Sequence, residues 1–133
     1  LEDLAADADG KIAIADPQLA PAGEYARAAL RSAGIWEQTQ GRLVPSIDVR
    51  AAAAAVAAGN ARFAIVYASD IRVFSDIRAV VEVPDSLHPP ITYPAAAIRD
   101  AGNPEAAKAF VRYLGGEEAG RILLEHGFGA RAR

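Results

Sequence analysis

IAIADPQLAPAGEYARAALRSAGIW, residues 12–36, is the stretch that decides the fold. The short apolar run at Lys11–Ala15 predicts a strand that is covered on both faces. Pro17 and Pro21 mark a loop after it, because proline interrupts both helices and sheet ladders. Pro21 also suits the first turn of a helix, so an Ala-rich helix is predicted to start near Ala22 or Gly23. Such a unit presents unpaired helix N–H groups beyond the carboxyl end of the strand, where open α/β sheets bind ligands and anions in particular.

A second loop-to-helix start follows in residues 45–60, PSIDVRAAAAAVAAGN. Ser46 or Asp48 can cap this helix, since either side-chain oxygen can accept from N–H groups of the first turn. The alanine run favours the helix, and a Gly-Asn pair ends it. Arg62–Tyr67, which reads RFAIVY, is the best predicted strand of the chain.

The remaining segments complete a β-α-α-β-β-β-α-α order without an internal repeat. This order predicts an α/β protein with a mostly parallel sheet flanked by helices and a C-terminal helical extension. Gly34 is expected to end the first helix in a left-handed conformation. The other predicted elements are a lead-in at Leu1–Gly10, a polar loop at Glu37–Arg42, a short strand at Leu43–Val44 stopped by Pro45, a polar loop at Ser69-Asp70, strands at Ala79–Val83 and Ala95–Ile98, and helices starting at Asn103 and Glu117.

Composition excludes several classes of function. The chain has 133 residues, which fits one domain or a lobe with an extension, and a net charge of −3, which favours neither nucleic acid nor an anionic membrane surface. Cysteine is absent, so disulfides, thiol catalysis and Cys-rich metal sites are excluded. Because the sequence begins with Leu1 and not Met, we interpret it as a processed or truncated product.

The sequence gives little support for catalysis. It contains no HExxH, GxSxG, P-loop or GxGxxG motif. We interpret His88 and His126 as structural residues, Asp16 as a loop residue that orders its own turn, and the Ser69-Asp70 pair as a loop cap. We therefore expect a protein that is not an enzyme, with no cofactor and no metal held by side chains.

Anion binding has better support, from three residues. Ala22 and Val49 lie at two predicted helix starts, and Tyr67 ends a predicted strand. Each signal alone is weak, because every helix has an N-terminus and a strand-terminal tyrosine is commonly a packing residue. Together they offer neutral donors, which suit a fully ionised oxyanion stabilised by N–H dipoles.

Five segments carry a resemblance to a known family: ADPQLAPAGEYARAAL, GIW, VPSIDVRAAAAAVAAGNARFAIVYASD, VEVPDSLHPPITYPAAAI and KAFVRYLGGEEAGRILLEHGF. In this order and spacing they resemble the periplasmic molybdate-binding proteins of ABC transporters over nearly the whole chain. The motifs PAGEYA, IDVR and IVYASD are specific when they occur together.

The resemblance implies a type II periplasmic-binding-protein-like fold of two lobes that holds molybdate or tungstate in its cleft with neutral donors only. Carried over by motif, Ala22 of PAG and Val49 of DVR would give backbone N–H groups, and Tyr67 of IVY would give its hydroxyl. The resemblance also implies a periplasmic location and an ABC transporter permease as partner.

The family pattern has a first lobe with two serine-bearing loops that find no counterpart here. By resemblance, residues 1–10 are a lead-in or crossover, residues 11–88 the second, anion-binding lobe, and residues 89–133 a segment that returns to the missing first lobe. We expect this segment to be exchanged between two copies of the 133-residue chain, as a tail-exchanged homodimer. The alternative function is the effector-sensing domain of a transcription regulator with the same two-lobed architecture.

Overall fold

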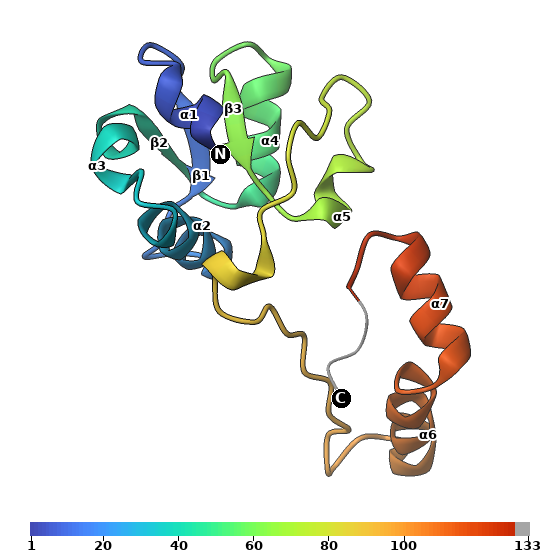
Figure 1. The fold of residues 1–133 in the computed structure, drawn as a ribbon. Coiled ribbons are helices and arrows are strands. Elements are labelled where there is room, and N and C mark those ends of the chain that lie inside the picture. The colour runs from blue at the N-terminus through green and yellow to red at the C-terminus, as the bar shows by residue number, and fades with distance from the viewer. Residues whose placement is uncertain (130–133) are drawn as a thin grey trace. The chain divides into compact units, whose positions relative to one another are not determined.

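The computed structural model describes residues 1–129, which divide into a first unit, Leu1–Pro90, and a second that begins at Ile91 (Figure 1). The second unit contains two helices, α6 (Pro104–Leu114) and α7 (Glu117–Glu125). The elements of the first unit are, in chain order, α1 (Glu2–Ala6), β1 (Ile12–Ala15), α2 (Pro21–Ser32), α3 (Trp36–Thr39), the 3-10 helix η1 (Gln40–Arg42), β2 (Leu43–Ser46), α4 (Val49–Ala57), β3 (Phe63–Ile65), α5 (Ala68–Ile71) and the 3-10 helix η2 (Asp85–Leu87).

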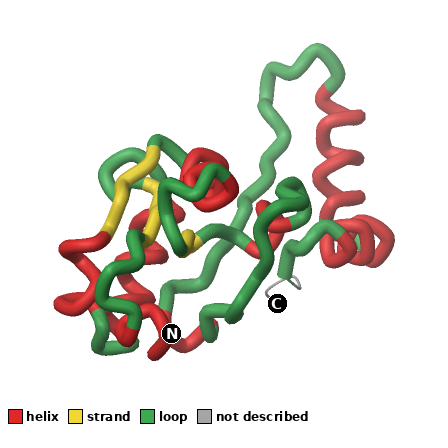
Figure 2. The backbone as a smooth tube through the Cα atoms, turned by 90° about the horizontal axis from the view of Figure 1, so that it is seen from above, coloured by secondary structure: helices red, strands yellow, loops and turns green. Residues whose placement is uncertain are grey.

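The predicted parallel sheet is confirmed. It has three strands in the order β2-β1-β3, all of them in the first unit, with both neighbours parallel to β1. Figure 2 shows the strands in yellow and the helices in red. In the register, Ile12 lies opposite Leu43 on one side and Phe63 on the other. All residues of β1 are buried, as expected for a central strand covered on both faces. β2 continues through Pro45 to Ser46, so the predicted stop at Pro45 is wrong; β2 is an edge strand, where proline is tolerated.

The core lies on the two faces of β1, because successive side chains of a strand point to opposite faces. On one face Ile12 and Ile14 pack with residues of α1, α2 and the start of α3, namely Leu4, Ala26, Leu30 and Ile35. On the other face Ala13 packs with Ala52 of α4 and with Ala61. Burying each large apolar side chain is worth about 1.5–3 kcal/mol, so the first face carries most of the hydrophobic stabilisation.

The second unit has almost no core of its own. Within residues 91–129, Ala119 is the single buried residue, whereas Phe110 of α6 is 59% exposed and Leu124 of α7 is 52% exposed. The predicted start of α6 is confirmed: the Asn103 side chain accepts a hydrogen bond from Ala106 N at 3.0 Å. Both helices are thus well formed locally, and their apolar side chains are left in contact with solvent.

Several predicted segments differ from the structure. The polar loop expected at Glu37–Arg42 is helical, because Thr39 is buried and its hydroxyl donates to Ile35 O at 2.8 Å. The lead-in Leu1–Gly10 contains α1, and Ser69-Asp70 lies in α5 and not in a loop. Within the described residues, Ala79–Val83 and Ala95–Ile98 form no strand: Val80 is 70% exposed and Ile98 is 76% exposed, and no ladder pairs either segment. None of the helices in the described part of the chain is long and apolar enough to cross a bilayer.

Candidate anion-binding site

The three residues predicted from the sequence to bind an anion lie at one edge of the sheet. Because the strands are parallel, their carboxyl ends meet at the same edge, and the connections to α2, α4 and α5 all leave from it. Ala22 is the second residue of α2, Val49 is the first residue of α4, and Tyr67 immediately precedes α5. The structure therefore brings the three residues to the same edge through three neighbouring strands.

The N-terminus of α2 is open toward this edge. Pro21 occupies the first helical position and has no N–H, Ala20 before it provides no side-chain cap, and Gly23 N donates to Ala20 O at 3.0 Å. Within the described part of the chain, the N–H of Ala22 has no hydrogen-bond acceptor. It is one of the orphan donors that every helix start leaves for a cap, water or a ligand.

Gly23 allows α2 to start this close to the end of β1. A Cβ at this position would lie 2.2 Å from Ala15 O and 2.6 Å from Pro17 N, well inside van der Waals contact with backbone atoms. From the sequence, Gly23 was predicted to lie near the start of the helix, but its packing role was missed. The available signal was a glycine in the first turn of a predicted helix, which lowers helix stability and so calls for a packing or functional reason.

Asp16 organises the loop between β1 and α2, as predicted. Its Oδ1 accepts from Gln18 N at 2.8 Å, and its carbonyl accepts from Leu19 N and Ala20 N, each at 2.9 Å. The Asp16 N–H donates to Ser46 O at the end of β2, at 2.8 Å. This last bond, which the sequence analysis did not foresee, ties the loop before α2 to the loop before α4.

The N-terminus of α4 is capped by Asp48, one of the two candidates left open by the sequence. Asp48 Oδ1 accepts from Ala51 N at 2.8 Å, whereas Ser46 is the last residue of β2. The cap satisfies the third N–H of the helix and not the first. Within residues 1–129, the N–H of Val49 has no hydrogen-bond acceptor, so a second open donor faces the same edge.

Tyr67 is held by a reciprocal pair of bonds with Asp70. Its N–H donates to Asp70 Oδ2 at 3.2 Å, and Asp70 N donates to Tyr67 O at 3.0 Å. Asp70 is buried, and its capping role agrees with the interpretation made from the sequence although α5 replaces the expected loop. The bonds fix the backbone from which the Tyr67 ring projects.

The two histidines take part in local hydrogen bonds. His126 Nδ1 donates to Ile122 O at 2.8 Å at the end of α7, and His88 Nδ1 donates to Pro89 O at 2.9 Å. These bonds agree with the structural role expected for both. Across the described residues, no group of three or more His, Cys, Asp and Glu side chains could hold a metal ion.

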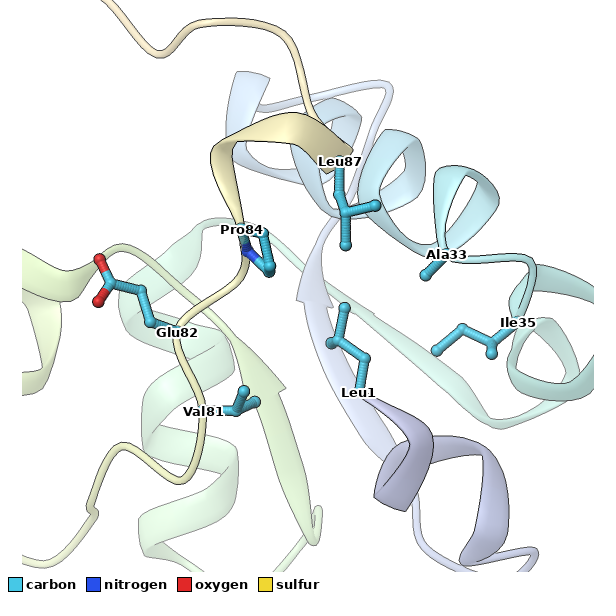
Figure 3. Close-up of a pocket in the computed structure, with 7 residues that line it drawn as sticks. All are labelled: Leu1, Ala33, Ile35, Val81, Glu82, Pro84 and Leu87. Carbon is cyan, nitrogen blue, oxygen red and sulfur yellow. The ribbon is translucent and has the colours of Figure 1, made fainter.

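A surface groove of about 440 Å³ lies elsewhere in the first unit and is mostly apolar (Figure 3). It adjoins Ala33 at the C-terminal end of α2, the end opposite Ala22. Figure 3 shows the side chains of Leu1, Ile35 and Leu87 pointing toward one another across it. The groove offers no cluster of donors for an anion, so the candidate site remains the carboxyl edge of the sheet. Its lining residues are Leu1, Ala33, Ile35, Val81, Glu82, Pro84 and Leu87.

Comparison with known proteins places the chain in a family. Residues 1–129 match the profile of the family described as bacterial extracellular solute-binding protein. The chain belongs to this family.

Individual relatives give more detail. The chain is 37% identical over 119 residues to the molybdate-binding protein ModA of Escherichia coli, covering 90% of this chain and 46% of that protein. It is 32% identical over 123 residues to ModA of Haemophilus influenzae, covering 92% of this chain and 48% of that one. The chain thus spans about half the length of these relatives.

Two solved structures of solute-binding proteins are similar to this chain. A substrate-binding domain assigned to a molybdenum ABC transporter of Clostridium difficile superposes with a TM-score of 0.86 at 33% identity, covering 99% of this chain and 58% of that one. The periplasmic molybdate-binding protein of Azotobacter vinelandii superposes with a TM-score of 0.71 over 96% of this chain and 58% of its own, at 23% identity, which supports the fold alone. These similarities are to solute-binding proteins and favour that class over the sensor domain of a transcription regulator.

Proposed function

We propose that this chain binds molybdate or tungstate as part of the solute-binding component of an ABC importer. The observation that carries the proposal is the pair of open N–H groups, Ala22 and Val49, at the starts of two helices on one edge of a parallel sheet. Both are neutral donors, and each lies in the positive field of a helix N-terminus, which stabilises an anion. The Tyr67 hydroxyl from the third strand would complete the set on this lobe.

The proposal extends to the organisation of the whole protein. Residues 11–88 would form the second, anion-binding lobe, residues 1–10 the crossover that enters it, and residues 89–133 a segment that packs on the first lobe. Relatives about twice as long, and a second unit with one buried residue between 91 and 129, support this division. The protein would act in the periplasm, deliver its oxyanion to a permease, and carry out no chemical reaction and need no cofactor.

Selectivity follows from the kind of groups at the site. The three carboxylates near this edge, Asp16, Asp48 and Asp70, each accept a hydrogen bond from a nearby backbone N–H, and the proposed site assigns none of them to the ligand. A protonated phosphate would therefore leave its O–H without an acceptor among the proposed donors, which costs about 1–3 kcal/mol, or roughly ten- to a hundredfold in affinity.

The experiment that tests the proposal is a titration of the 133-residue chain with sodium molybdate, followed by backbone amide resonances. Binding is expected to be weak, because the other lobe would supply the remaining donors, and the amide signals of Ala22 and Val49 should shift together. Phosphate at the same concentrations should shift neither amide signal. Shifts confined to other residues, or equal shifts with phosphate, would contradict the proposed site.

Val49 allows a clean removal of one donor. Val49→Pro deletes the N–H but keeps the helix, because proline is well tolerated at the first helical position and Asp48 before it is already extended, with φ −155° and ψ 178°. A hydrogen bond to a charged group is worth about 1.5–3 kcal/mol, so affinity should fall about tenfold or more. Val49→Ala, which keeps the N–H, is the matched control and should bind as the unmodified chain does.

Tyr67→Phe tests the third donor in the same titration. The ring stays, so the circular dichroism spectrum should not change, while loss of the hydroxyl should weaken binding. At Ala22, a serine should be tolerated because the N–H remains. Unchanged affinity in both Val49→Pro and Tyr67→Phe would place the ligand elsewhere.

A further inference from the structure

Asp16 makes hydrogen bonds with both of the loops that carry the proposed backbone donors. Its own N–H donates to Ser46 O at 2.8 Å, at the point where β2 gives way to the loop before α4. Its side chain accepts from Gln18 N at 2.8 Å, and its carbonyl accepts from Leu19 N and Ala20 N, which closes the turn before α2. One residue thus connects the start of α2 to the start of α4.

The first turn of α2 is seated directly on this turn. The position of a Cβ at Gly23 would lie 2.8 Å from the carbonyl carbon of Asp16 and 2.6 Å from Pro17 N. Two hydrogen bonds, Ala20 N to Asp16 O at 2.9 Å and Gly23 N to Ala20 O at 3.0 Å, hold the segments together, and the close packing leaves no room for them to approach further. The N–H of Ala22, one residue before Gly23, is therefore fixed with respect to Asp16.

We propose that Asp16 is a positioning residue that sets the separation between the N–H groups of Ala22 and Val49, and thereby the size of the tetrahedral oxyanion that they accept. The inference rests on the proposed function. Molybdate and the smaller sulfate are both tetrahedral dianions with the same kind of acceptor oxygens, so charge does not separate them. Donors held at a fixed separation discriminate by size, whereas donors free to move adapt to either ion.

Three variants isolate this role. Asp16→Ala removes the acceptor for Gln18 N, whereas Asp16→Asn keeps an oxygen that can accept the same bond. Asp7→Ala is the control at the other end of β1, because it removes a bond of the same kind, Gly10 N to Asp7 Oδ1 at 3.1 Å, together with the ion pair between Asp7 and Arg62. All three variants should keep the circular dichroism spectrum of the unmodified chain.

The first measurement is amide hydrogen exchange without ligand. In Asp16→Ala, exchange should become faster for Gln18 and also for Ala51, whose N–H is held by Asp48 Oδ1 in the other loop and lost no bond of its own. In Asp16→Asn and Asp7→Ala, exchange at Ala51 should stay as it is in the unmodified chain. Unchanged exchange at Ala51 in Asp16→Ala would overturn the positioning role, whether or not the chain binds any anion.

The second measurement compares titrations with sodium molybdate and sodium sulfate, followed at the Ala22 and Val49 amides. In the unmodified chain and in Asp16→Asn, molybdate should bind more tightly than sulfate. In Asp16→Ala the ratio of the two affinities should fall about tenfold, the effect of one misaligned bond to a charged group. A loss of affinity that is equal for both ions would overturn the size role and indicate general loosening. If molybdate shifts neither amide in the unmodified chain, the proposed function fails, while the exchange measurement still decides the role of Asp16.

Discussion

At the scale of single residues, the site depends on places where backbone approaches backbone. Gly23 has no side chain, and α2 begins where any Cβ would meet Ala15 O at 2.2 Å. A helix that starts this close to the end of its strand presents its open N–H at the sheet edge and not above it. Glycine is therefore required at position 23 by the lack of room for a side chain. Its backbone conformation does not require glycine, because its φ is not positive.

We expect Gly23→Ala to destabilise the first unit. Forcing an extra carbon into packed backbone costs about 1–3 kcal/mol, and the relief would push the start of α2 away from β1. Urea unfolding followed by circular dichroism measures the loss. Gly41→Ala is the control, because a Cβ there meets nothing within 4 Å, and its unfolding midpoint should match that of the unmodified chain. Equal midpoints for both variants would show that α2 can shift without cost.

At the scale of elements, Arg42 holds the short helix α1 in place. Its guanidinium donates to three carbonyl oxygens, those of Leu4, Asp7 and Gly10, at 2.5, 2.5 and 2.7 Å. Carbonyls near a helix C-terminus lack partners within the helix and carry partial negative charge, so a cation there is stabilising. A helix as short as α1 is not stable alone, and this contact together with burial of Leu4 fixes it on the core.

Arg42→Lys should release α1. The compact lysine ammonium cannot reproduce the planar fork that reaches the three carbonyls, and each part-buried carbonyl left without a donor costs about 1–3 kcal/mol. Amide hydrogen exchange of residues 1–10 should become faster, and the urea midpoint should fall. Arg50→Lys, at an exposed position on α4, should change neither quantity. Unchanged exchange in Arg42→Lys would show that Leu4 alone anchors the helix.

Elements with strong local signals were predicted from the sequence. β1 is a continuous apolar run, α6 begins with Asn-Pro, and Gly34 ends α2 with a φ of 71°, as expected. Elements that depend on distant contacts were missed: α3 is helical because Thr39 is buried. The predicted strand at Ala79–Val83 fails for the same reason, because β-branched residues favour a strand only where another strand pairs with it.

In the candidate site, too, features with local sequence signals were predicted and contacts between distant residues were not. Ala22, Val49 and Tyr67 were predicted because helix starts and strand ends have local signatures, and family resemblance selected among them. The bond from Asp16 N to Ser46 O joins residues that lie 30 positions apart, and no local pattern indicates it. The proposed donors could therefore be named from the sequence, while the contact between their two loops needed the fold.

At the scale of the whole molecule, the two units differ in the amount of hydrophobic core that they contain. In the described part of the chain, both core clusters and all strand pairs lie within residues 1–90. A chain that ends at Pro90 should therefore keep a cooperative thermal unfolding transition and the circular dichroism signature of an α/β protein. Loss of cooperative unfolding in this shortened chain would show that residues after Pro90 complete the core.

The second unit should find a partner surface in another copy of the chain. Leaving Phe110, Ile122 and Leu124 in water forgoes about 1.5–3 kcal/mol for each, and the stiff Pro89–Pro94 segment disfavours a tight fold-back. We expect a homodimer that exchanges residues after Pro89 across a two-fold axis. Sedimentation over a dilution series checks this expectation. A compact monomer at every concentration would contradict it and show that the tail packs on its own chain.

Two of the three proposed donors at the sheet edge are main-chain groups, and this has a consequence for how the site tolerates genetic change. In a saturation scan of the gene scored for oxyanion uptake, substitutions of Val49 should have little effect on uptake, because every residue except proline retains the backbone N–H. The sensitive positions should instead be Gly23 and Asp16, which hold the backbone in place. For these two main-chain donors, selection would therefore act on the residues that support the backbone and not on the side chains of the donor residues themselves.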